Sequence, residues 1–106
     1  MDKTYEIIDG VRRSKAAQMA GHQTISARLY AKGAATLIRE FEVAIADVRS
    51  PHKSAIRRVS QGDHRRWQRV VEAARQSPLP FPPIEGVEGR RGVQVADISF
   101  DFGEDQ

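Results

Sequence analysis

The stretch from Ser60 to Phe102 constrains the fold of this chain more than any other part of it. Ser60 and Asp63 have the spacing of a helix cap, which places a hydroxyl on free amides and an acid at the positive end of the helix dipole. Apolar residues then recur every three or four positions, as they do on one face of an amphipathic helix. They are Trp67, Val70, Val71 and Ala74. This pattern predicts a helix over residues 61–77 with Trp67 in a core.

A proline-rich connector follows the predicted helix. Pro78 ends the helix, because its ring disfavours helical backbone angles at Ser77 and it has no amide hydrogen to donate. Three further prolines keep the chain extended, and three glycines then give it the composition of a mobile turn. They are Pro80, Pro82 and Pro83, followed by Gly86, Gly89 and Gly92. We predict a connector over residues 78–92 and favour a structural role for its prolines over a role as a ligand for an aromatic groove.

Residues 93–102 carry the last pattern, in which apolar and polar side chains alternate. The apolar members at its centre and end are Ala96, Ile98, Phe100 and Phe102. A period of two is typical of a strand with one buried face, so this segment predicts a closing strand.

The N-terminal residues predict a helix and a strand. Asp2 or Thr4 can cap a helix over residues 1–21, and Gly21 suits its end because glycine adopts left-handed backbone angles without a Cβ penalty. Residues 24–30 alternate weakly, as a strand does.

Residues 34–48 fit two kinds of secondary structure. Their apolar side chains line one face at helical spacing, and good helix formers favour that interpretation by a small margin. At strand spacing they also line one face, with Arg39 as the exception. The pattern leaves both alternatives open.

The run VSQGDHRRWQRVVEAARQSPLPFPP, followed by GVQVADISFDF, resembles the C-terminal domain of the TonB/TolA family of periplasmic proteins. The resemblance extends mainly over residues 58–102. Its matching positions are Ser60, Gly62, Val71, Ala74, Arg75, Pro78, Pro82, Pro83, Val95, Ile98 and Phe100. The family pattern implies that residues 34–48 are a strand and that residues 54–60 are the strand returning beside it.

Together these elements predict one α+β domain over residues 1–106. It would hold a small antiparallel sheet of about three strands, with two helices packed on one face. Residues 22–60 would supply its first strands and residues 93–102 its last one. If the last strand lies at the sheet edge, its unpaired backbone groups are open to another extended chain.

The resemblance implies a non-catalytic domain that binds an extended segment of an outer-membrane receptor or a periplasmic protein at this edge. The expected partner-binding residues are Val93, Val95, Asp97, Ile98, Ser99, Phe100 and Asp101. A second copy can pair with the same edge, so a homodimer is also expected. The protein would be periplasmic if an anchor outside this chain holds it there, and cytoplasmic otherwise.

The distribution of charge supports an alternative function. Residues 49–75 hold eight lysines and arginines against Asp63 and Glu72, whereas residues 97–106 hold four acids and no base. Such a basic segment is either a solvated surface or a phosphate-binding one. In a nucleic-acid-binding domain the candidate phosphate contacts are Arg57, Arg58, Arg65, Arg66 and Arg69, and Trp67 would stack on a base if it were exposed.

Catalysis, metals and cofactors find little support in the sequence. The chain has no cysteine, and the three histidines lack the spacing of a helical metal pair. Ser50 with His52, and Asp63 with His64, lie in predicted turns, where such residues have conformational roles. No apolar run approaches the roughly 20 residues of a membrane span. We therefore expect no enzyme activity, no cofactor and no metal site.

Overall fold

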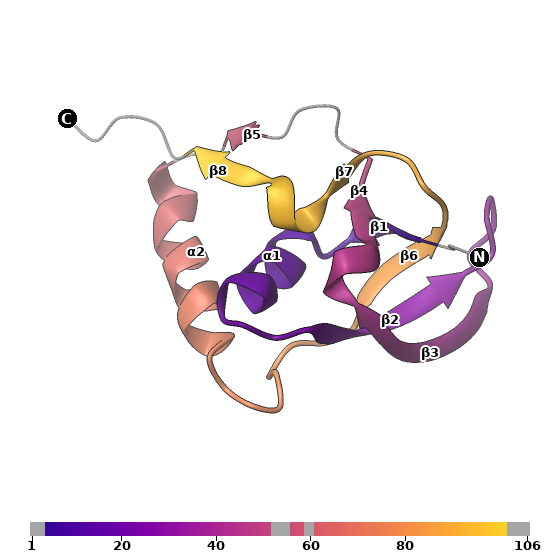
Figure 1. The fold of residues 1–106 in the computed structure, drawn as a ribbon, viewed down its shortest axis with the longest axis horizontal. Helices are drawn as coiled ribbons and strands as arrows, with labels where there is room; N and C mark the ends of the chain where they lie inside the picture. Colours follow the sequence, from indigo (N-terminus) through magenta and orange to yellow (C-terminus); the bar gives the residue numbers. More distant parts are fainter. Residues whose placement is uncertain (1–3, 52–55, 59–60, 102–106) are drawn as a thin grey trace.

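The computed structural model of the protein describes residues 4–51, 56–58 and 61–101. These residues form short strands and two helices, joined by turns (Figure 1). In chain order the elements are β1 Tyr5–Asp9, α1 Val11–Met19, β2 Thr24–Tyr30, β3 Leu37–Ala44, a 3-10 turn Ile45–Asp47, β4 Val48–Ser50, β5 Ile56–Arg58, α2 Gln61–Ala73, β6 Ile84–Glu88, β7 Val93–Gln94, a second 3-10 turn Val95–Asp97 and β8 Ser99–Asp101.

A six-stranded mixed sheet forms the centre of the fold, in the order β3-β2-β6-β1-β4-β7. β1 runs parallel to β4 and β2 runs parallel to β6, whereas the other neighbours are antiparallel. β5 and β8 pair in parallel as a separate two-stranded sheet. The protein is α+β, but the prediction of a small antiparallel sheet of about three strands is wrong.

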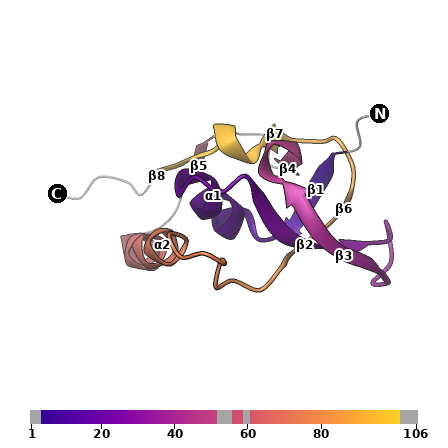
Figure 2. The same ribbon diagram turned by 60° about the horizontal axis from the view of Figure 1, so that its bottom comes forward.

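The helices form two successive layers beside the sheet. Figures 1 and 2 show α1 between α2 and the six-stranded sheet. α2 packs on α1 through Trp67, Ala74 and Ala16, and this cluster also receives Phe100 of β8. The predicted arrangement, with both helices packed on one face of the sheet, is therefore wrong as well.

The strand β6 lies at the centre of the sheet, where the sequence predicts a mobile connector. That prediction rested on the prolines and on Gly86, Gly89 and Gly92, residues that are also typical of a turn. A Cβ on Gly86 would overlap with the backbone oxygen of Glu6 and with the ring of Tyr5 on β1. Glycine is required here by the close approach of two strands rather than by flexibility.

The N-terminal helix begins at Val11, later than a cap at Asp2 or Thr4 would place it, since residues 5–9 form β1. Tyr5 and Ile7 lie on the same face of this strand and are buried in the core. Gly10, with φ 120°, separates β1 from α1, and a Cβ there would overlap with Ile84 of β6. The predicted start of the helix is therefore wrong.

The predicted end of that helix is confirmed at Gly21. Gly21 has φ 93°, and the amide of His22 donates to the carbonyl oxygen of Ala17 at 3.0 Å. This six-to-one hydrogen bond is the one that closes a helix whose next residue is left-handed.

In the middle of the chain several elements agree with the prediction and one pairing differs. The strand over residues 24–30 is confirmed as β2, and the strand interpretation of residues 34–48 is confirmed over Leu37–Ala44. Residues 56–58 are a strand, but β5 pairs with β8 and does not return beside β3. The other residues of that predicted strand, and Ser60, lie outside the described residues.

The predicted helix over residues 61–77 is α2, which ends at Ala73. After it, the amides of Arg75 and Gln76 donate to the carbonyl oxygens three residues earlier, those of Glu72 and Ala73. Such bonds tighten the last turn of a helix. Trp67 is 8% exposed, so its predicted place in the core is confirmed.

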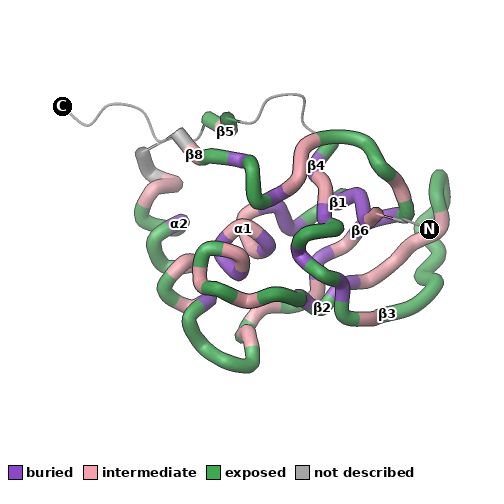
Figure 3. Tube along the Cα trace, in the orientation of Figure 1, coloured by how far each residue is buried: buried purple, intermediate pink, exposed green. Residues whose placement is uncertain are grey.

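The predicted closing strand over residues 93–102 is divided by the 3-10 turn Val95–Asp97. Val95 and Ile98 are 0% and 1% exposed, and in a 3-10 turn residues three apart lie on the same side. The 3-10 turn Ile45–Asp47 buries Ile45 and Val48 by the same spacing. Figure 3 shows the buried segments gathered at the centre of the molecule, where these turns meet α1 and the sheet. A single closing strand is therefore wrong, and Phe102 lies outside the described residues.

Candidate functional site

The residues expected to bind a partner do not form one exposed strand. Val93 lies in β7 at one edge of the main sheet, whereas Ser99, Phe100 and Asp101 lie in β8 beside β5. Between them Val95 and Ile98 are in the core, and Asp97 belongs to the 3-10 turn. The structure thus gives these residues three different positions instead of one continuous edge.

Two aromatic side chains of the predicted sites pack on each other. The rings of Trp67 and Phe100 meet edge to face, with 4.5 Å between their centroids. Such a contact adds about 0.5–1.5 kcal/mol to the burial of the two rings. Because Trp67 is part of the core, it offers no surface on which a base can stack.

The arginines, in contrast, meet at a cavity between distant parts of the chain. This cavity, which we name the arginine cleft, has a volume of about 400 Å³ and is lined by residues 8–13, Arg57 of β5 and Val70 of α2. Arg12, Arg13 and Arg57 contribute three guanidinium side chains to its lining. The first two are 44 or more positions from Arg57 in sequence, so only the tertiary fold brings them together.

The turn between β1 and α1 builds the floor of the arginine cleft. Gly10 is the residue before α1 and provides no side-chain cap for the first amides of the helix. These amides and the helix dipole give the start of a helix a partial positive charge. The buried hydroxyl of Ser14 donates to the carbonyl oxygen of Gly10 at 2.5 Å, which holds the turn in place.

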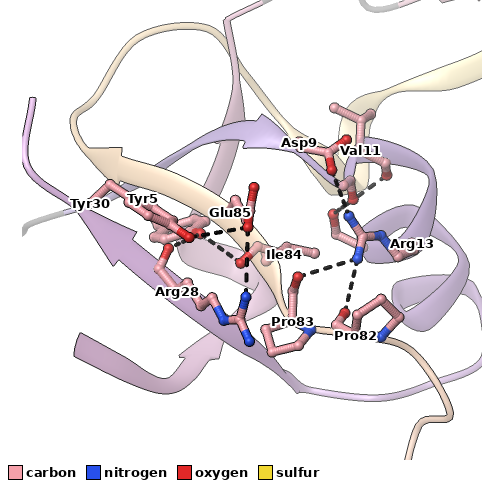
Figure 4. Close-up of polar contacts among 12 residues, drawn as sticks. Tyr5, Asp9, Val11, Arg13, Arg28, Tyr30, Pro82, Pro83, Ile84 and Glu85 are labelled. Atoms are coloured by element: carbon pink, nitrogen blue, oxygen red, sulfur yellow. Dashed lines mark hydrogen bonds and ion pairs between the residues drawn. The ribbon is translucent and has the colours of Figure 1, made fainter. Parts of the chain in front are cut away.

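Arg13 is fixed at this turn by three partners (Figure 4). Its guanidinium donates to the carboxylate of Asp9 at 3.1 Å and to the carbonyl oxygens of Pro82 and Pro83 at 3.0 and 3.2 Å. The same contacts tie the proline connector to α1. Arg13 is therefore a positioned charge with a structural role.

Arg12 is held more loosely than Arg13. A nitrogen of Arg12 lies 3.6 Å from one carboxylate oxygen of Asp63, and Arg66 lies 3.6 Å from the other. Long ion pairs between partly exposed side chains contribute roughly 0–1 kcal/mol. A phosphate entering the arginine cleft can therefore replace Asp63 as the partner of Arg12 at little cost.

The other arginines proposed for phosphate contacts are divided between the cleft and the far surface. Arg66 lies four residues before Val70, so it projects from the side of α2 that faces the arginine cleft. Arg69 lies beside Arg66 on the helix surface, whereas Arg65 is turned about 140° away from Val70. Arg58 follows Arg57 in a strand and points to the opposite side.

Sequence reasoning missed Arg12 and Arg13, the two arginines that form the floor of the site. It placed both of them inside a longer helix. The available signal was the strand-like alternation of residues 5–7, followed by Gly10 and then the two arginines. A glycine after such a run marks a turn at which a strand can end and a helix begin.

Two further observations concern metal ions and membranes. Among the residues that the structure describes, no three His, Asp or Glu side chains gather as a metal site. Neither helix in that part of the chain is long and apolar enough to span a membrane.

Comparisons with protein-family models, with curated proteins and with solved structures find no match to this chain. The resemblance to the TonB/TolA family therefore stays a prediction. The case for a function rests on the geometry of the arginine cleft.

Proposed function

We propose that this protein binds phosphate groups of a nucleic acid in the arginine cleft. The observation that carries the proposal is the meeting of Arg12, Arg13 and Arg57 at one cavity of about 400 Å³. Guanidinium groups bind phosphate oxygens through paired, charge-assisted hydrogen bonds, which favours arginine for this task. The start of α1 adds its partial positive charge in the same place.

The charges around the cleft favour an anion. Four arginines, Arg12, Arg13, Arg57 and Arg66, stand against two carboxylates, those of Asp9 and Asp63. This leaves a local excess of two positive charges. An excess of that size attracts an anion over a distance of about 8–10 Å in physiological salt.

A polymer fits this surface better than a mononucleotide does. Arg66 is 76% exposed in its side chain and lies beside the cleft, and Arg69 extends the basic surface further along α2. A chain of phosphodiesters can contact the cleft and this surface together, whereas a single nucleotide occupies the cleft alone. Because the described residues that line the cleft include no aromatic side chain, we expect contacts to phosphate and little sequence preference.

The protein-interaction function implied by the TonB/TolA resemblance has less support. It requires residues 93–101 to form one accessible strand, and these residues are divided between two sheets and the core. Nucleic-acid binding needs only surfaces that the described structure contains.

The test is binding of fluorescent single-stranded and duplex oligonucleotides, measured by anisotropy from 50 to 200 mM salt. Arg57→Gln should weaken binding on the order of ten-fold, since one charge-assisted hydrogen bond is worth roughly 1.5–3 kcal/mol. It should also reduce the dependence of log Kd on log salt by about one unit. Arg75→Gln is the matched control, because Arg75 is an exposed arginine of the segment after α2 and lies outside the cleft lining.

Three results would contradict the proposal. Equal losses in the Arg57 and Arg75 variants would indicate diffuse attraction without a site. Absence of oligonucleotide binding at 50 mM salt would remove the function. Displacement of the oligonucleotide by a nucleoside triphosphate at micromolar concentration would show that the phosphate source is a nucleotide instead.

A further inference from the structure

The strand β3 forms a long, free edge of the main sheet. Among the described strands its neighbour is β2, with which it pairs from Thr24 opposite Ala44 to Tyr30 opposite Leu37. β3 has eight residues, whereas β7 at the other edge has two. An edge strand presents alternate N–H and C=O groups to any extended chain that approaches it.

Acidic side chains line one face of this edge. Val43 packs in the core, so Glu40 and Glu42 point to the opposite, outer face. Glu40 pairs with Arg28 at 2.8 Å, and the oxygens of Glu42 accept from the hydroxyls of Thr24 and Ser26. A carboxylate has about four acceptor positions, so both can take another donor from the free side.

The acidic face extends inward over the next strands. Arg28 of β2 lies directly opposite Glu40 of β3 and Glu85 of β6 in the sheet register. One arginine thus serves two carboxylates there, and no described lysine or arginine pairs with Glu42. An added strand that carries positive side chains at every second position would match this face.

Charge also argues against a second copy at this edge. In an antiparallel pair, directly opposite residues share a face, so the two residue numbers in a two-fold register differ by an even number. Registers centred on Arg39, on Glu40 and on Glu42 each place that residue opposite its own copy. The register centred on Phe41 places Glu40 opposite Glu42. Every central register therefore sets like charges against each other, which destabilises the pair.

We propose that β3 binds an extended, lysine- or arginine-bearing segment of another protein by strand addition. Backbone hydrogen bonds to the free edge supply the affinity, and basic side chains opposite Glu40 and Glu42 select the partner. Exposed apolar side chains at the start of the strand, Leu37 at 47% and Ile38 at 57%, offer additional contact area. This surface is independent of the arginine cleft, because the two share no lining residue.

The experiment uses the full chain, labelled with ¹⁵N, and a capped ten-residue peptide of alternating lysine and valine. Binding should shift the amide resonances of residues 37–44 and slow hydrogen exchange at alternate amides of β3. The double variant Glu40→Gln, Glu42→Gln should raise Kd by a factor of between about two and thirty, because it removes two charge pairs across the strands. Glu72→Gln is the control, since Glu72 is an exposed carboxylate on α2.

Several outcomes would overturn the proposal. One is a glutamate–valine peptide that binds as tightly as the lysine–valine peptide. Another is a peptide that shifts resonances without slowing exchange in β3, because that would be charge attraction without strand addition. Absence of binding would also refute it, as would sedimentation showing a dimer paired through β3 that an excess of the peptide does not dissociate.

Discussion

Replacing Gly86 by alanine distinguishes two structures for residues 84–88, the central strand that is observed and the mobile connector that the sequence suggests. β6 lies between β2 and β1, and a Cβ on Gly86 would overlap with the backbone oxygen of Glu6 and the ring of Tyr5. The neighbouring backbone cannot yield without disturbing the β1–β6 pairing. Overpacking of this kind costs about 1–3 kcal/mol, and more where backbone is displaced.

The ring of Tyr5 is also constrained. Its hydroxyl donates to the carbonyl oxygen of Arg28 at 2.7 Å and lies 3.2 Å from that of Ile84 (Figure 4). Moving the ring would weaken the hydrogen bond that this hydroxyl donates, which is worth roughly 0.5–1.5 kcal/mol. We therefore predict that Gly86→Ala lowers the free energy of unfolding by about 3 kcal/mol or more. In a mobile turn the same change would raise it by about 0.4–1 kcal/mol.

Urea denaturation, followed by the fluorescence of the single tryptophan and by far-ultraviolet circular dichroism, measures this difference. Gly33→Ala is the matched control, because Gly33 has φ 76° and no atom within 4 Å of an added Cβ. It should cost about 1–2 kcal/mol, from backbone strain alone. A Gly86→Ala protein as stable as the unmodified one, or more stable than the Gly33 variant, would refute the close approach of β6 and β1.

Two further predictions test the packing of α2 and the environment of Tyr5. Trp67→Ala should lower the free energy of unfolding by about 3–5 kcal/mol, because it leaves a cavity in the cluster between α1 and α2. Urea denaturation followed by circular dichroism measures this loss. A loss below about 1 kcal/mol would contradict that packing. Burial raises the pKa of the Tyr5 phenol above its usual value, so the folded protein binds this proton more tightly than the unfolded chain does. The contribution of this group to the free energy of unfolding is fully present below about pH 10 and decreases as the pH rises further. Urea midpoints measured from pH 9 to 11.5 should therefore fall less steeply in Tyr5→Phe than in the unmodified protein. An unchanged slope would contradict this prediction.

Helical periodicity and local end signals were the reliable parts of the sequence. The apolar face of α2 and the glycine that ends α1 depend on residues a few positions apart, and both were predicted. The alternation of β2 was recognised for the same reason. The strand β3 was chosen over a helix only with the help of a family resemblance that no comparison supports.

Sheet membership was predicted much less well, because it depends on neighbours that are distant in the chain. The residues of β1 were predicted as the start of a helix, since Tyr5, Ile8 and Val11 also have helical spacing. Residues 84–88 were predicted as part of a mobile turn because Gly86, Gly89 and Gly92 follow one another closely, whereas they form β6. Residues 93–102 were predicted as one continuous strand. Val95 and Ile98 instead reach the core through a 3-10 turn, and a pattern of alternating residues does not indicate a spacing of three.

The candidate sites divide in the same way between sequence and structure. The sequence by itself determined that Trp67 belongs to a core and that the chain carries an arginine-rich segment over residues 49–75, because composition and helical spacing are local properties. Only the tertiary structure decided that Arg57 meets Arg12 and Arg13 at one cavity, and that β3, not residues 93–101, forms the long free edge. Both follow from the strand order β3-β2-β6-β1-β4-β7, in which pairings between distant segments are selected by burial of the whole core rather than by any short stretch of residues.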